Sequence, residues 1–186
     1  MKKITLALAA SSVAFAAPAF AQSETSSESF TVTAEVPQVC AMADINDVDL
    51  GELDINRSSG SEALSLLSNE TGSSNDFWIS CNDATSLTLS SANQGMINLD
   101  RGAPTGDDAD LFTNKINYNF RLLNFTDANR SAQPVLRTDR QASATFAGTE
   151  IHREVTASIT VLRDDNPLLL LAGDYEDVAT VEITTL

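Results

Sequence analysis

Apolar and polar residues alternate along much of this chain, which is the pattern of half-buried β-strands. Alternating segments lie at 86–91, 116–122 and 155–161, and FWISC at 77–81 is a short strand that delivers a cysteine. Apolar residues also gather at 48–55. Clusters rich in Ser, Asn, Gly and Asp, such as NRSSGSE and NETGSSND, separate these segments and mark turns. Short strands spaced by turns predict an all-β sandwich.

The C-terminal stretch AGDYEDVATVEITTL predicts one more strand. Four apolar positions fall on one face, and Glu176, Thr180, Glu182 and Thr184 fall on the other, as in a half-buried strand. No further segment of this kind follows in the sequence, so we expect its outer edge to be unpaired. An unpaired edge is a place where another strand can add. The positions expected to face the core are Tyr175, Ala179, Val181 and Ile183.

Residues 1–21 are predicted to be a secretory signal peptide. MKKITLALAASSVAFAAPAFA begins with a charged region, continues with an apolar run and ends with the A-x-A pattern of a cleavage site. The apolar run is too short to span a bilayer. We therefore expect export from the cytoplasm and a mature chain of residues 22–186, which is long enough for one domain with its own core.

Residues 22–38 are predicted to be an N-terminal extension of a body that spans residues 39–186. The extension opens with the polar stretch QSETSSES, whose composition is typical of a flexible tether. It continues as FTVTAEV, with an apolar side chain at every second position. Such a segment has the chemistry of a strand that adds to the sheet edge of another molecule. Its apolar residues are Phe30, Val32, Ala34 and Val36.

The chain has two cysteines, Cys40 and Cys81. In an exported protein an even pair indicates a disulfide. A structural zinc site would need further Cys or His ligands, and the single histidine, His152, is distant in sequence. We therefore predict a disulfide between the two cysteines.

The charge is strongly acidic, with 26 Asp and Glu against 11 Lys and Arg and a net charge of −15. Cleavage of the signal peptide removes Lys2 and Lys3 and makes the chain more negative still. Binding to nucleic acid is dominated by Lys and Arg contacts with phosphates, so a nucleic-acid partner is not expected, and neither is an anionic membrane surface. The charge is typical of a surface that resists non-specific association.

Candidate catalytic and metal-binding chemistry is sparse. A Ser-His-Asp hydrolase would need His152 as its base, but this residue begins a strand and no nucleophile-elbow motif occurs. Asp107, Asp108 and Asp110 could hold calcium, although their spacing is not that of an EF-hand loop. No phosphate-binding loop or cofactor motif is found. We expect no enzyme activity, no catalytic residues, no cofactor and no metal site.

Several of these features together resemble the pilin subunits of chaperone–usher fimbriae, and most closely the archaic group that carries the spore coat protein U domain. An alternating segment leads into a cysteine in FTVTAEVPQVC, a Leu-Gly pair follows in VDLGEL, and FWISCND holds the second cysteine. INYNFRLLNFTDANRS is similar to the family's Tyr-containing strand and the turn after it. The tail looks like the family's closing pattern, at Gly173, Tyr175, Asp177, Val181 and Ile183.

The resemblance implies an incomplete immunoglobulin-like β-sandwich that lacks its last strand and is completed by a donated one. The donor residues would be Phe30, Val32, Ala34 and Val36. The acceptor groove would be bordered by the tail strand. Partners would be copies of the chain or sister subunits, a periplasmic chaperone and an outer-membrane usher. The product would be a surface fimbria that supports adhesion or biofilm formation.

Two other functions are compatible with the same residues. In one, the chain is a secreted β-sandwich binding module whose own extension folds back into its groove. In the other, it is a calcium-dependent adhesin that uses Asp107, Asp108 and Asp110. Deletion of residues 23–36 distinguishes the self-complemented module from a fimbrial subunit. The deletion would unfold a self-complemented monomer, whereas it would block the assembly of a fimbrial polymer. The sequence leaves open whether the strand acts within one chain or between chains.

Overall fold

The computed structural model describes residues 26–126 and 133–186, without the side chain of Asp108. The predicted signal peptide therefore lies outside the described residues. The chain divides into two units, Met1–Glu35 and Val36–Leu186. The described part of the first unit, residues 26–35, has no secondary structure, whereas the regular secondary structure described in the second unit consists of β-strands and two single 3-10 turns.

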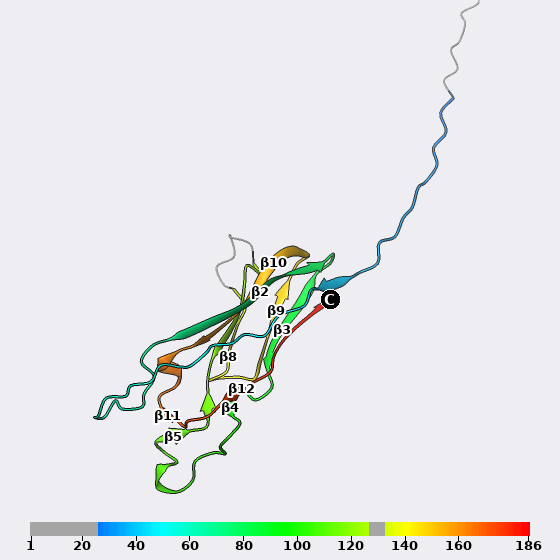
Figure 1. Ribbon diagram of the computed structural model, residues 1–186. Coiled ribbons are helices and arrows are strands. Elements are labelled where there is room, and N and C mark those ends of the chain that lie inside the picture. The colour runs from blue at the N-terminus through cyan, green and yellow to red at the C-terminus, as the bar shows by residue number, and fades with distance from the viewer. Residues whose placement is uncertain (1–25, 127–132) are drawn as a thin grey trace, which may run out of the picture. The chain divides into compact units, whose positions relative to one another are not determined.

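The larger sheet has five antiparallel strands in the order β1-β2-β10-β7-β8. The long strands β2 and β10 run side by side through it (Figure 1). One end of the sheet is β1, which is short and pairs with the last residues of β2. The strands span Cys40–Met42 (β1), Glu70–Cys81 (β2), Ile151–Val161 (β10), Asn119–Leu123 (β7) and Val135–Arg137 (β8).

A second antiparallel sheet has the order β13-β3-β9. Its strands span Ala179–Thr185 (β13), Thr85–Ser91 (β3) and Ser143–Gly148 (β9). Two small sheets complete the body. One contains β12 (Tyr175–Glu176), β4 (Met96–Asn98) and β6 (Lys115–Ile116), and the other pairs β11 (Leu169–Leu170) with β5 (Phe112–Thr113). Single 3-10 turns lie at Gly106–Asp108 and Arg163–Asp165.

The two main sheets share one hydrophobic core, so the predicted all-β sandwich is confirmed. The alternation read from the sequence is the cause, because every second residue of a strand faces the same side. In β3, Leu87 and Leu89 are fully buried, and they meet buried side chains from the larger sheet. These include Phe77, Ile79, Phe120, Leu122, Val155 and Ala157.

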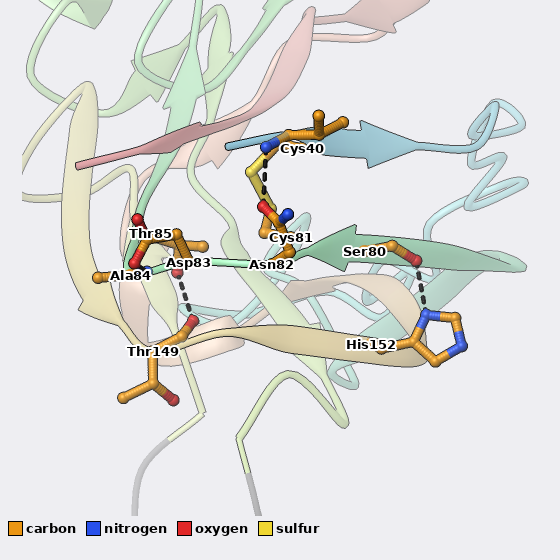
Figure 2. The surroundings of a disulfide bond; sticks show 10 residues. Cys40, Ser80, Cys81, Asn82, Asp83, Ala84, Thr85, Thr149 and His152 are labelled. Atoms are coloured by element: carbon orange, nitrogen blue, oxygen red, sulfur yellow. Dashed lines mark hydrogen bonds between the residues drawn. A yellow bond between two sulfur atoms is a disulfide. The ribbon is translucent and has the colours of Figure 1, made fainter. Parts of the chain in front are cut away.

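The predicted disulfide between Cys40 and Cys81 is present and joins β1 to the end of β2. Figure 2 shows it at the point where β2 continues through Asn82 and Asp83 toward β3. The bond closes a loop of 41 positions. A crosslink over such a loop stabilises the folded state mainly by restricting the unfolded chain, by about 4 kcal/mol on the chain-entropy model.

The tail differs from the single strand that was expected. The tail is divided between β12 and β13, which pair with different sheets. The division has a physical reason, because Asp177 turns inward to bind the hydroxyls of buried Tyr118 and Ser91 instead of continuing a ladder. The apolar stretch at 48–55 forms no strand and contributes one isolated bridge, between Ile55 and Leu66.

Candidate functional site

The outer edge of β13 has no strand partner among the described residues. The strand pairs with β3 on one side, from Ala179 opposite Ser91 to Thr185 opposite Thr85. Similarly, β1 is the last strand of the larger sheet and pairs with β2 alone. On this side of the described sandwich, β13 and β1 are therefore both terminal strands, and the backbone groups along their open edges are available to an added strand.

A groove follows the inner side of the first half of β13, at Ala179 and Val181, and continues past β12 toward β11. It consists of two adjoining hollows with cavity volumes of about 570 and 810 Å³. Both hollows are lined by Val48, Leu50, Met96 and Tyr175, so they form one continuous depression. We call this depression the acceptor groove.

One wall of the acceptor groove is the segment 45–50, which lies beside β2 without being a strand. Asn75 of β2 holds it, because the backbone N of Asn46 donates to the Asn75 Oδ1 at 2.8 Å. Gly72 lets it approach closely, since a Cβ at that position would lie 2.7 Å from the Cγ1 of Val48 and 3.0 Å from the Cδ2 of Leu50. A glycine inside a strand often marks such a close approach.

The opposite wall is the C-terminal segment, from Tyr175 through Val181. The floor is apolar and comes from the larger sheet, through Phe120 of β7 and Ala157 and Ile159 of β10. Chemically the groove offers a row of apolar contacts beneath an unpaired strand edge. This combination suits an extended peptide with an apolar side chain at every second position.

Asp177 fixes the turn between β12 and β13. Its carboxylate accepts hydrogen bonds from the Tyr118 hydroxyl at 2.7 Å, from the backbone N of Asn93 at 3.0 Å and from the Ser91 hydroxyl. The Ser91 Oγ in turn accepts from the backbone N of Gly95 at 3.0 Å. The network ties the start of β13 to β3 and to the groove floor.

Tyr118 is kept protonated by its surroundings. Burial raises the pKa of its hydroxyl above the ordinary value; the Asp177 carboxylate acts in the same direction, and the hydrogen bond with Ser91 opposes it. A protonated hydroxyl can donate to Asp177, which a phenolate could not. Burial also raises the pKa of Tyr175, whose hydroxyl donates to the backbone O of Leu171 at 2.7 Å.

The residues predicted to form the apolar face of the tail differ in their surroundings. Tyr175, Ala179 and Val181 line the acceptor groove. Ile183 is half-buried and packs against the core cluster instead. The second wall, at 45–50, was not identified from the sequence, and the one available signal was the apolar pair of Val48 and Leu50.

The predicted donor residues are exposed in this single chain. Phe30, Val32 and Val36 have exposed fractions of 86%, 80% and 78%. The alternation FTVTAEV therefore forms no strand by itself, which agrees with the rule that a strand needs a partner to satisfy its backbone groups.

The candidate catalytic base, His152, contacts two side chains of β2. The His152 Nδ1 lies 2.8 Å from the Ser80 Oγ, and its ring is stacked at a tilt on Trp78, with centroids 4.8 Å apart. Among the described residues no carboxylate is hydrogen-bonded to the imidazole, so this Ser-His pair has no third member. Within the same part of the chain, no group of three or more His, Cys, Asp or Glu is arranged to hold a metal ion.

No helix among the described residues is long and apolar enough to cross a membrane. Comparison with protein-family models, with curated proteins and with solved structures found no match.

Proposed function

We propose that the protein is a structural subunit of a surface fimbria, and that subunits are linked when the N-terminal segment of one copy adds to the acceptor groove of another. The observation that carries the proposal is the outer edge of β13, which is unpaired among the described residues and lies above a groove with an apolar floor. The same chain has an alternating apolar segment that is exposed. The edge of β13 lacks a strand partner, and the exposed segment lacks a groove for its apolar side chains.

The dimensions of the two elements agree. β13 is seven residues long, as is the 30–36 segment. Each would extend over about 23 Å at ~3.3 Å per residue. A strand of that length places Phe30, Val32, Ala34 and Val36 on one face, toward the floor of Phe120, Ala157 and Ile159.

An added strand would also cover the open edge of β13. It would lie in the groove between β13 and the segment 45–50, so that this edge gains hydrogen bonds. Exposed edges of this kind promote aggregation unless they are covered. The proposal therefore includes a periplasmic chaperone that covers the groove before assembly and an outer-membrane usher that exchanges it for the next subunit.

The test uses the full chain expressed with its export signal. Material from the cell envelope is run on a denaturing gel without boiling, because polymers held by buried strands dissociate slowly. We expect a ladder of multimers that disappears when residues 23–36 are deleted. A monodisperse monomer from the undeleted chain, with a melting temperature unaffected by the deletion, would overturn the proposal.

A further inference from the structure

Residues 37–39, which join the N-terminal segment to β1, are held against the residues that follow β2. The Asn82 Nδ2 donates to the backbone O of Pro37 at 2.8 Å, and the backbone N of Val39 donates to the Asn82 Oδ1 at 2.8 Å. The backbone N of Asn82 donates to the O of Val39 at 3.2 Å. The Gln38 side chain also donates to the Asp83 carboxylate. We call this set of contacts the exit clamp.

The exit clamp lies at the same end of the body as the last residues of β13. Cys40 is paired with Cys81 and the backbone N of Asn82 bonds to Val39, so the clamped residues continue β1 beyond the end of β2. Thr185 is paired with Thr85, close to the same connection. Figure 1 accordingly shows the short blue arrow of β1 beside the C-terminus.

The position of the exit clamp determines how the N-terminal segment would have to fold back into its own chain. To enter the groove of its own chain, the N-terminal segment would have to reverse direction and run beside β1 as a hairpin. Residues 37–39 would make a loop of acceptable length, since hairpin loops of two to five residues are common. In the clamp, however, these residues are bonded to Asn82 and Asp83, and a hairpin turn at 37–39 would break these bonds.

With the clamp closed, the turn has to be taken from the donor segment itself. A reversal before Pro37 would place Ala34 and Val36 in the turn and leave Phe30 and Val32 for the groove. A second copy has no such restriction, because its whole 30–36 segment is available. The clamp therefore penalises addition within one chain and leaves addition between chains unaffected.

We propose that Asn82, assisted by Asp83, is a positioning residue that selects addition to another copy over folding back into the same chain. The inference rests on the proposed function, because it presumes that the 30–36 segment enters a groove. On this proposal, the side chains of Asn82 and Asp83 determine whether the chain forms a polymer or a self-complemented monomer.

The test is a crosslink that reports where the segment lies. Thr33 is the midpoint of 30–36 and Glu182 is the midpoint of β13, and both are exposed. Their side chains face away from the groove, and the central pair meets whether the added strand runs parallel or antiparallel. The full chain carrying Thr33→Cys and Glu182→Cys is oxidised in the periplasm, and mass spectrometry verifies that Cys40–Cys81 is retained.

With the clamp intact we expect a crosslinked ladder and no crosslinked monomer. Adding Asn82→Ala should convert at least about a tenth of the chains to a crosslinked monomer, and Asp83→Ala, which removes a single bond of the clamp, should give a smaller share. Asn166→Ala is the matched control. It removes a similar asparagine bridge, with bonds of 2.7 and 2.9 Å to Asn117, and should leave the ladder free of crosslinked monomer.

The other outcomes separate the two proposals. A crosslinked monomer in the clamped chain, or a ladder without monomer in both clamp variants, would overturn the role of Asn82 while leaving strand addition in place. Absence of any crosslink in every form would overturn the proposed function itself. A crosslinked monomer in the Asn166→Ala control would mean that general loosening, and not the clamp, permits folding back.

Discussion

Replacement of Phe30 by alanine measures how much one donor side chain contributes to a link between subunits. Phe30 is 86% exposed in the single chain. A phenylalanine presents about 200 Å² of surface, so its full burial in a groove removes roughly 170 Å² from water. At ~25 cal/mol per Å² this is an upper bound of about 4 kcal/mol.

The loss on substitution is smaller than this bound, because alanine still buries a methyl group and because ordering the segment has an entropic cost. Truncating a buried Phe in this way should weaken the link by about 2–3 kcal/mol. Since 1.4 kcal/mol corresponds to a factor of ten, polymers of Phe30→Ala should dissociate about 30- to 150-fold faster than those of the unmodified chain.

The assay follows the fraction of polymer that remains with time in denaturant at constant temperature. Thr33→Ala is the matched control, because Thr33 lies on the opposite face of the same segment and should change the rate little. Equal dissociation rates for Phe30→Ala and Thr33→Ala would refute the reasoning, since the alternating face would then bury nothing.

Three further predictions concern the body of the protein. Replacing both Cys40 and Cys81 by alanine should lower the free energy of unfolding by about 4 kcal/mol, measured by denaturant titration, and an unchanged midpoint would contradict the role of the bond. Gly72→Ala should displace the wall at Val48 and reduce both stability, by about 1–3 kcal/mol, and polymer yield. Because the pKa of Tyr118 is raised by folding, the unfolded chain loses this proton first, and stability should fall as the pH rises above about 10. Tyr118→Phe should flatten that decline in thermal melts, and an equally steep decline in the variant would contradict the assignment.

The sequence was informative wherever one physical rule dominated. The alternation of apolar and polar residues was enough to predict β3 and most of β10, because in these strands no other interaction competes with the burial of one face. The even pair of Cys40 and Cys81 was enough to predict the disulfide. The break in the tail was not foreseen, because it depends on Asp177 meeting Tyr118, which comes from a distant part of the chain.

For a similar reason, only one wall of the groove could be predicted from the sequence. One wall is β13, whose alternation is local. The other wall, at 45–50, has no strand and depends on the absence of a side chain at Gly72 and on the side chain of Asn75. The exit clamp likewise depends on Asn82 meeting Pro37 and Val39 across 45 and 43 positions. Pairings between distant residues leave no periodic signal in the sequence.

Amide hydrogen exchange along β13 tests the central claim most directly. The backbone N of Leu186 donates to Ala84 and the O of Val178 accepts from Ala92, so even-numbered residues bond toward β3. Backbone direction alternates along a strand, and the amides of Val181 and Ile183 therefore point to the open edge. We predict that these two amides become protected only in the polymer, whereas that of Glu182 is protected in both states. Equal exchange of Val181 and Ile183 in monomer and polymer would contradict strand addition at this edge.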